Sequence, residues 1–133
     1  MVPMFKRFAI LALVGLVAAC GRVDTIYSVQ NEELGAPPSA TIQQVGQAID
    51  RAATGLGWTV AQERPGLAIA TLDVRTHKAV VTIAYDTKRY RIAYKDSVNL
   101  KYDGKDIHYR YNSWIRHLRN DIEKEAAAIR PGA

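Results

Sequence analysis

The stretch that decides the fold is AVVTIAYDTKRYRIAY, at residues 79–94. Apolar side chains recur in it at every second position, which is typical of β-strands with one buried face. One phase of this alternation contains Val81, Ile83, Tyr85, Tyr90, Ile92 and Tyr94. Only residues 86–88 separate the two runs. Because so short a connection allows a hairpin and no crossover, the stretch predicts two antiparallel strands.

Two further strands are expected before this hairpin, at residues 58–62 and 67–75. Arg64-Pro65-Gly66 is a turn signal, since proline presets the turn and glycine tolerates positive φ. The apolar phase slips midway along residues 67–75, which predicts a bulge near residues 70–71. Together the four strands predict an antiparallel meander.

An amphipathic helix is expected on each side of the meander. The first runs from a cap at Ser39 or Thr41 to about Gly55, and the second starts between Ile107 and Ser113. Each has one apolar stripe that needs a sheet beneath it. The sequence therefore predicts an α+β fold of order α-β-β-β-β-α. It would be a two-layer sandwich, a four-stranded antiparallel meander with the N- and C-terminal helices on one face. Trp58 and Trp114 are expected in its core.

The N-terminus has the pattern of an export signal. Lys6 and Arg7 precede an apolar run over residues 8–19, which ends in the small residues Val17-Ala18-Ala19 before Cys20. This ending resembles the lipobox of bacterial lipoproteins. The resemblance implies cleavage before Cys20 and attachment of lipid to its thiol and amino group. The expected organisation is a lipoprotein signal peptide at residues 1–19, a tether at 20–39 and a single α+β domain at 40–133.

Two alternatives to lipidation are a plain signal peptide and an uncleaved anchor. The apolar run has about a dozen residues, whereas a membrane-spanning helix needs about 20. Cys20 is the only cysteine, and an unpaired thiol is a liability in an oxidising compartment. Lipidation of Cys20 would make the membrane the first partner. Gly21 follows where aspartate would signal inner-membrane retention in enteric bacteria, so the outer membrane facing the periplasm is expected.

Residues 21–39 are expected to act as a tether because they contain Pro37-Pro38 and few apolar side chains. One alternative stays open. Residues 25–29, Thr-Ile-Tyr-Ser-Val, have a strand-like composition and would suit a sheet edge.

Composition and motifs argue against several functions. The whole chain has a net charge of +5, of which the signal carries two charges, and this mild excess does not predict nucleic-acid binding. His77, His108 and His117 have no metal-ligand spacing, so no metal or cofactor is expected. His108 is expected to make a buried or capping contact at the start of the last helix. No nucleophile elbow or phosphate-binding glycine loop occurs.

Tyrosine is the unusual residue, with six between residues 85 and 111. These tyrosines either line the core or form a recognition surface, because tyrosine combines apolar area with a hydroxyl group. The candidate binding surface consists of Tyr90, Arg91, Tyr94, Lys95, Tyr109 and Arg110. The outer sheet face, with Val80, Thr82 and Ala84, is either solvated or a docking surface.

The segment Ile107-His108-Tyr109-Arg110-Tyr111-Asn112-Ser113-Trp114-Ile115, with Gly57-Trp58 and residues 77–81, resembles a group of small uncharacterised proteobacterial lipoproteins. The resemblance spans about residues 42–122 and implies no activity. The favoured hypothesis is a non-enzymatic, lipid-anchored cell-envelope lipoprotein that binds a protein or another envelope component. The alternatives are a periplasmic module that binds a small molecule or glycan through the tyrosine-rich surface, and a hydrolase with an unrecognised site.

Overall fold

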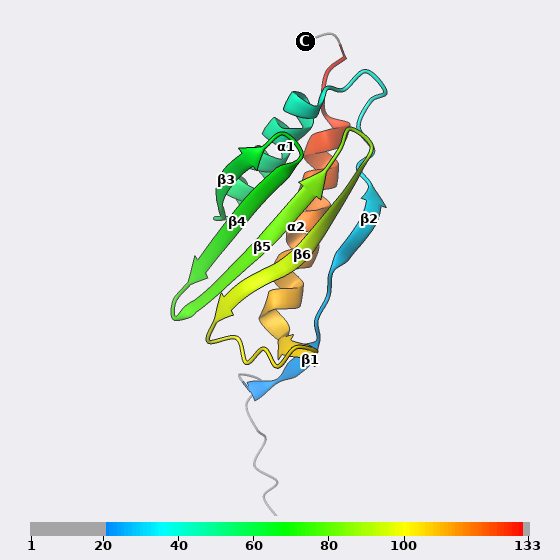
Figure 1. Ribbon diagram of the computed structural model, residues 1–133. Coiled ribbons are helices and arrows are strands. Elements are labelled where there is room, and N and C mark those ends of the chain that lie inside the picture. Colours follow the sequence, from blue (N-terminus) through cyan, green and yellow to red (C-terminus); the bar gives the residue numbers. More distant parts are fainter. Residues whose placement is uncertain (1–20, 132–133) are drawn as a thin grey trace, which may run out of the picture.

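The computed structural model describes residues 21–131. Cys20 and the expected signal peptide lie outside these residues. The described chain forms seven strands and two helices (Figure 1). In chain order they are β1 (Val23–Thr25), β2 (Val29–Glu33), α1 (Ile42–Gly55), β3 (Thr59–Arg64), β4 (Leu67–Val74), β5 (His77–Tyr85), β6 (Arg89–Val98), β7 (Asp106–His108) and α2 (Tyr109–Ala127).

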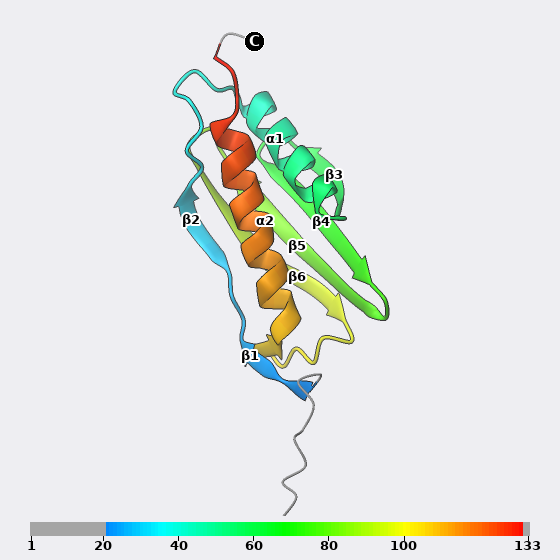
Figure 2. The same cartoon turned by 180° about the vertical axis from the view of Figure 1, so that it is seen from behind.

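The main sheet has five antiparallel strands in the order β2-β6-β5-β4-β3. Both helices lie on the same face of this sheet, and no helix among residues 21–131 covers the opposite face (Figures 1 and 2). The α+β class and the side of the sheet that the helices cover are therefore as expected. The expected meander corresponds to β3–β6, which is only part of the sheet.

The strand count and the expected tether over residues 20–39 require correction. β2 extends the main sheet by pairing with β6, and β1 pairs with β7 in a separate two-stranded sheet. Val29 and Leu34 are each only 1% exposed, so this segment contributes to the core. The alternative strand at residues 25–29 is wrong in its bounds: Thr25 ends β1, Val29 begins β2, and residues 26–28 connect the two strands. The sequence did not predict this pairing because the partner strands, β7 and β6, lie far along the chain. Local composition gives no signal of such distant pairing.

A buried asparagine fixes the turn between β1 and β2. Asn112 of α2 is 3% exposed, its Oδ1 accepts a hydrogen bond from the Tyr27 amide at 2.8 Å, and its Nδ2 donates to the Thr25 carbonyl at 2.9 Å. The Asn112 amide thus bonds two backbone groups that no neighbouring strand of the described chain bonds. This contact joins the start of the described chain to the last helix.

Small residues occupy part of the sheet face that the helices cover. Ala68, Ala70 and Ala79 point inward from β4 and β5, and each is fully buried. The bulge expected near residues 70–71 is absent, because β4 pairs with β5 without a register shift from Leu67 to Val74. The expectation failed because it assigned the larger Leu67 and Ile69 to the buried face. The register shifts of the main sheet lie in other strand pairs, one of them between β5 and β6 after Val80.

The helices begin as their sequences indicate. The Thr41 side chain accepts from the Gln44 amide and the Gln44 side chain accepts from the Thr41 amide, which makes a capping box. His108 caps α2 by accepting the Arg110 amide on Nδ1 at 3.2 Å. Trp58 is buried at 3% exposure, whereas Trp114 is only half-buried against the core. Of the two tryptophans, Trp58 is therefore the core residue.

Gly46 of α1 provides a test of this close packing. A Cβ at Gly46 would lie 2.7 Å from Tyr85 Oη, and that hydroxyl donates to Gln62 Oε1 at 2.8 Å. Alanine in place of glycine inside a helix ordinarily stabilises by about 1 kcal/mol. We expect Gly46→Ala to lower the free energy of unfolding instead, measured by urea denaturation. In a Tyr85→Phe background the penalty should vanish, because the clashing oxygen is gone. Stabilisation by Gly46→Ala in both backgrounds would contradict this packing.

Asn112 provides a second test. Asn112→Ala should lower the free energy of unfolding by about 2 kcal/mol, because it leaves the part-buried Tyr27 N–H and Thr25 C=O without their side-chain partner. Amide exchange at Tyr27 should accelerate at the same time. Asn120→Ala is the matched control, since Asn120 lies on the same helix and is exposed. Equal stability of the two variants would show that residues 25–27 are held by other contacts.

Candidate functional site

A cleft of about 600 Å³ lies at the end of the domain where the described chain begins. Three elements meet there: the β4–β5 turn, the loop that follows β6, and the first turn of α2. We call it the basic cleft. It is lined by Val74, Arg75, His77, Asn99, Lys101, His108, Tyr109 and Arg110.

The lining of the basic cleft contains three cations and no carboxylate. Arg75, Lys101 and Arg110 are exposed, and within residues 21–131 none of them forms an ion pair with a carboxylate. The N-terminus of α2 adds partial positive charge at the same place. The cleft is therefore a concentrated region of positive potential, which favours anions.

Two histidines form hydrogen bonds to backbone groups that line the cleft. His77 Nδ1 lies 2.7 Å from the Asn99 carbonyl oxygen, and since a carbonyl only accepts, Nδ1 carries the hydrogen. His108 Nδ1 accepts the Arg110 amide, so the hydrogen of this ring is on Nε2. The rings of His77 and His108 lie 5.4 Å apart, and Tyr109 stacks on His108 at 4.8 Å. The expected capping contact of His108 is confirmed.

The backbone of the cleft is strained. The described residues contain four non-glycine residues with positive φ, and three of them line this cleft. They are Arg75 at φ 56°, Asn99 at 59° and Lys101 at 55°. Left-handed backbone is unfavourable for arginine and lysine, whereas asparagine tolerates it better. Strain of this kind clusters at functional sites.

The structure separates the six residues of the expected binding surface. Only Tyr109 and Arg110 line the basic cleft. Arg91 and Lys95 are exposed on β6, and Arg91 lies opposite Ala84 on the outer sheet face. The remaining tyrosines, Tyr90 and Tyr94, belong to other parts of the molecule.

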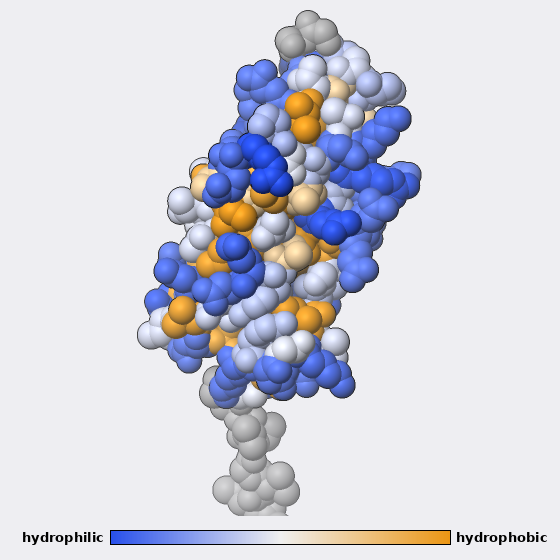
Figure 3. Space-filling model, in the orientation of Figure 1, coloured by the Kyte–Doolittle hydropathy of each residue, from blue (hydrophilic) through white to orange (hydrophobic). Residues whose placement is uncertain are grey.

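Tyr90 is 2% exposed in the core, and Tyr94 packs on Tyr102 and Tyr111 with ring centroids at 4.1 and 6.0 Å. Tyr85 and Tyr111 are buried as well. Most of these tyrosines therefore line the core. The outer sheet face shows apolar groups as separate patches between hydrophilic ones (Figure 3).

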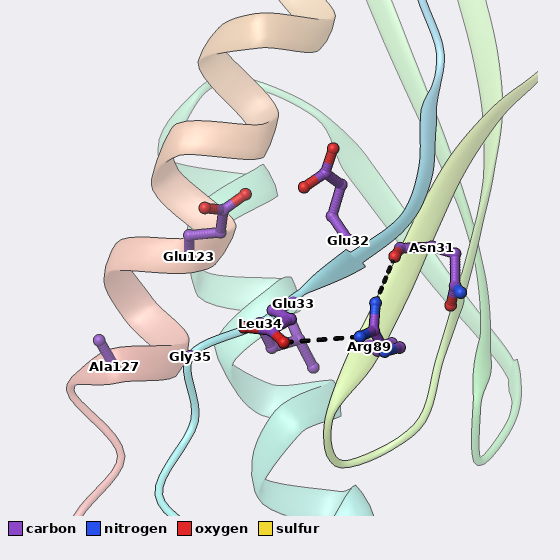
Figure 4. A pocket seen from close by; sticks show the side chains of 8 residues that line it. All are labelled: Asn31, Glu32, Glu33, Leu34, Gly35, Arg89, Glu123 and Ala127. Atoms are coloured by element: carbon purple, nitrogen blue, oxygen red, sulfur yellow. Dashed lines mark hydrogen bonds and ion pairs between the residues drawn. The ribbon is translucent and has the colours of Figure 1, made fainter.

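A second hollow, of about 640 Å³, lies between β2 and α2. Glu32 and Glu123 extend toward it from β2 and α2, while Arg89 bonds the Asn31 carbonyl and Glu33 (Figure 4). Its lining consists of Asn31, Glu32, Glu33, Leu34, Gly35, Arg89, Glu123 and Ala127.

Arg119 links the carboxylates of this hollow. Its guanidinium lies 3.1 Å from Glu123 and 3.5 Å from Glu32, and it donates to the Tyr27 hydroxyl at 2.9 Å. Hydrogen bonds to Tyr27 and Glu123 raise the pKa of Arg119 above its ordinary value. Glu123 also accepts the Tyr90 hydroxyl at 2.6 Å. We call this network of hydrogen bonds and ion pairs the Arg119 clasp. It consists of Tyr27, Glu32, Tyr90, Arg119 and Glu123, and it joins β2, β6 and α2.

Tyr90 makes the clasp sensitive to alkali. Burial, and then the hydrogen bond to Glu123, raise the pKa of Tyr90 above its ordinary value of 10.0. Above that pH the unfolded chain loses the tyrosine proton while the folded protein keeps it, so stability falls as pH rises. We expect urea denaturation to show a stability plateau below pH 10 and a decline above it. Tyr90→Phe should make the decline shallower, and an unchanged slope would contradict the assignment. Some decline should remain, because burial also raises the pKa of Tyr111.

Of the three cations in the basic cleft, the sequence pointed to Arg110, which was expected in the binding surface with Tyr109. Arg75 and Lys101 were missed, because they lie in a turn and a loop and their proximity depends on pairing between distant strands.

Comparison of the chain with protein-family models, curated proteins and solved structures finds no match. Within residues 21–131, no group of three or more His, Cys, Asp or Glu side chains is placed to hold a metal ion. No helix among these residues has the length and hydrophobicity needed to cross a membrane.

Proposed function

We propose that this protein is a lipid-anchored cell-envelope lipoprotein, attached through Cys20 to the outer membrane on its periplasmic side. Its role is to bind an envelope component, and it has no enzymatic activity. The proposal combines the lipobox-like ending at Cys20 with the arrangement of the domain that begins one residue later.

The observation that carries the proposal is where the exposed apolar side chains lie. Among the described residues, the large hydrophobic side chains that are exposed are Val23, Val98 and Tyr102, at 39%, 53% and 36%. Val23 is in β1, Val98 ends β6, and Tyr102 lies in the loop between β6 and β7. These elements meet at the lower end of Figure 1, where the described chain begins. Apolar and tyrosine side chains at one end suit a lipid interface.

The short distance to the anchor supports the same orientation. Because β1 starts at Val23, only Gly21 and Arg22 separate the lipid-bearing residue from the first strand. A long flexible linker would let the domain turn freely, but two residues hold this end against the bilayer. The opposite end, with the β5–β6 turn, then points away from the membrane.

A binding role agrees with the chemistry of the two hollows. The carboxylates of the β2–α2 hollow are engaged by Arg119 and Tyr90, and the phenol of Tyr90 has a raised pKa that keeps it neutral. These groups hold elements together. The basic cleft, in contrast, presents charge to the outside.

The anchor is tested by fractionation. Cys20→Ser should release the protein from membranes washed with high salt, or leave it unprocessed, because several acyl chains anchor firmly while a thiol-free residue accepts none. Normal processing and retention of the variant in the membrane fraction would overturn the proposal.

The orientation is tested by fluorescence. Once Cys20 is acylated, an introduced cysteine is the only free thiol, since the chain has no other cysteine. An environment-sensitive dye on Tyr102→Cys should shift to shorter wavelength when the lipidated protein is moved from detergent into nanodiscs. The same dye on Lys88→Cys, in the β5–β6 turn, is the control and should not shift. Equal shifts at both positions would contradict the orientation.

A further inference from the structure

We propose that the basic cleft binds a phosphate-bearing anion, either the head group of an anionic phospholipid or free phosphate. The lipid source rests on the proposed membrane anchor, whereas the anion site itself rests only on the described residues. Arg75, Lys101 and Arg110 are the binding residues. His77, His108 and Asn99 position them.

The donors of the cleft match a phosphate group. Arginine offers several N–H donors in a planar fork, and lysine offers a compact ammonium group, and both are common phosphate ligands. The three cations come from three separate elements, the β4–β5 turn, the loop after β6 and the start of α2. They therefore surround a shared space, where no lining carboxylate competes with a bound anion.

The strained backbone at Arg75 and Lys101 indicates that these two side chains are not there for the fold. Arg75 is the first residue of a two-residue turn, because Val74 pairs with His77. A turn with positive φ at that position favours glycine. Lys101 also has a left-handed backbone. Glycine would suit both positions better, so folding does not explain why cationic side chains occupy them.

The cleft lies beside the attachment point of the anchor. A Cβ built on Gly21 would be 3.6 Å from Lys101 Nζ, and Gly21 directly follows Cys20. Arg22 stacks over Tyr109, with its guanidinium carbon 5.3 Å from the ring centre. An anchored domain would thus hold the cleft at the depth of the lipid head groups, where each lysine or arginine contributes about 1 kcal/mol of attraction to an anionic surface.

The test uses the full lipidated protein in a neutral detergent. It is titrated separately with dihexanoylphosphatidylglycerol, dihexanoylphosphatidylcholine and inorganic phosphate at constant ionic strength. Amide NMR signals of His77, Lys101, Tyr109 and Arg110 report binding. We expect phosphatidylglycerol to shift these signals and zwitterionic phosphatidylcholine to have a much weaker effect. Tighter binding of phosphatidylglycerol than of phosphate identifies a head group, and equal binding identifies free phosphate.

Substitution by glycine separates binding from folding. Arg75→Gly and Lys101→Gly should each weaken phosphatidylglycerol binding about fivefold, as expected for the loss of one cation near an anion. Because glycine relieves the left-handed backbone, neither variant should melt at a lower temperature than the wild type. Arg75→Lys keeps the charge and should retain most of the binding. Lys88→Ala, an exposed lysine in the β5–β6 turn, is the charge-matched control and should bind normally.

The outcomes distinguish this inference from the proposed anchor. If no probe shifts the cleft signals, or if both glycine variants bind like the wild type, the anion site is wrong whatever Cys20 does. If Lys88→Ala weakens binding as much as the glycine variants, the attraction is general and the cleft is no site. If the cleft binds phosphate but Cys20→Ser leaves membrane attachment intact, the anchor fails and the site stands.

Discussion

The two hydrogen bonds of Asn112 are the constraint on which the arrangement of this domain depends. They hold residues 25–27 against α2, and the chain is thereby directed into β1 on one side and β2 on the other. β1 then pairs with β7, and β2 closes one edge of the main sheet. The Arg119 clasp fastens the same segment again through Tyr27 and Glu32. The N-terminal segment is thus part of the folded domain.

This integration would also determine how the domain is placed relative to the anchor proposed at Cys20. Had residues 21–39 been a free linker, any face of the domain could meet the membrane, and the position of the basic cleft would have no consequence. Because only Gly21 and Arg22 separate β1 from Cys20, an anchor at Cys20 would hold the end that carries Val23, Val98 and the cleft toward the membrane. Under the proposed attachment, the contacts that complete the fold would also decide which surface is presented to lipid.

The sequence predicted those parts of the fold whose signals are local. Capping by Thr41, the apolar stripe of α2 and the hairpin at residues 86–88 follow from spacings of a few residues. β2 escaped prediction because Gln30, Asn31 and Glu33 are polar and exposed, as suits an edge strand, and its partner β6 lies about 60 residues away. The inward alanines of β4 were misassigned because the larger Leu67 and Ile69 alternate with them, and local hydrophobicity favoured the larger side chains for the buried face. Arg75 and Lys101 of the cleft share this limit, since a left-handed backbone and proximity across strands leave no pattern in the chain.

The two ends of the molecule obey different constraints. Around α1 and β5, close packing explains which residue occupies each position. Gly46 leaves space for the Tyr85 hydroxyl, and Gln62 accepts the hydrogen bond that this hydroxyl donates. Around the cleft, residues sit where the backbone would favour glycine, and exposed cations gather without carboxylates to balance them. A fold optimised only for stability would have glycine at the left-handed positions and carboxylates near the cations, because neither feature contributes to the core. Their coincidence beside Gly21, at the end that also exposes apolar side chains, supports the proposed anion site, because folding alone explains neither feature.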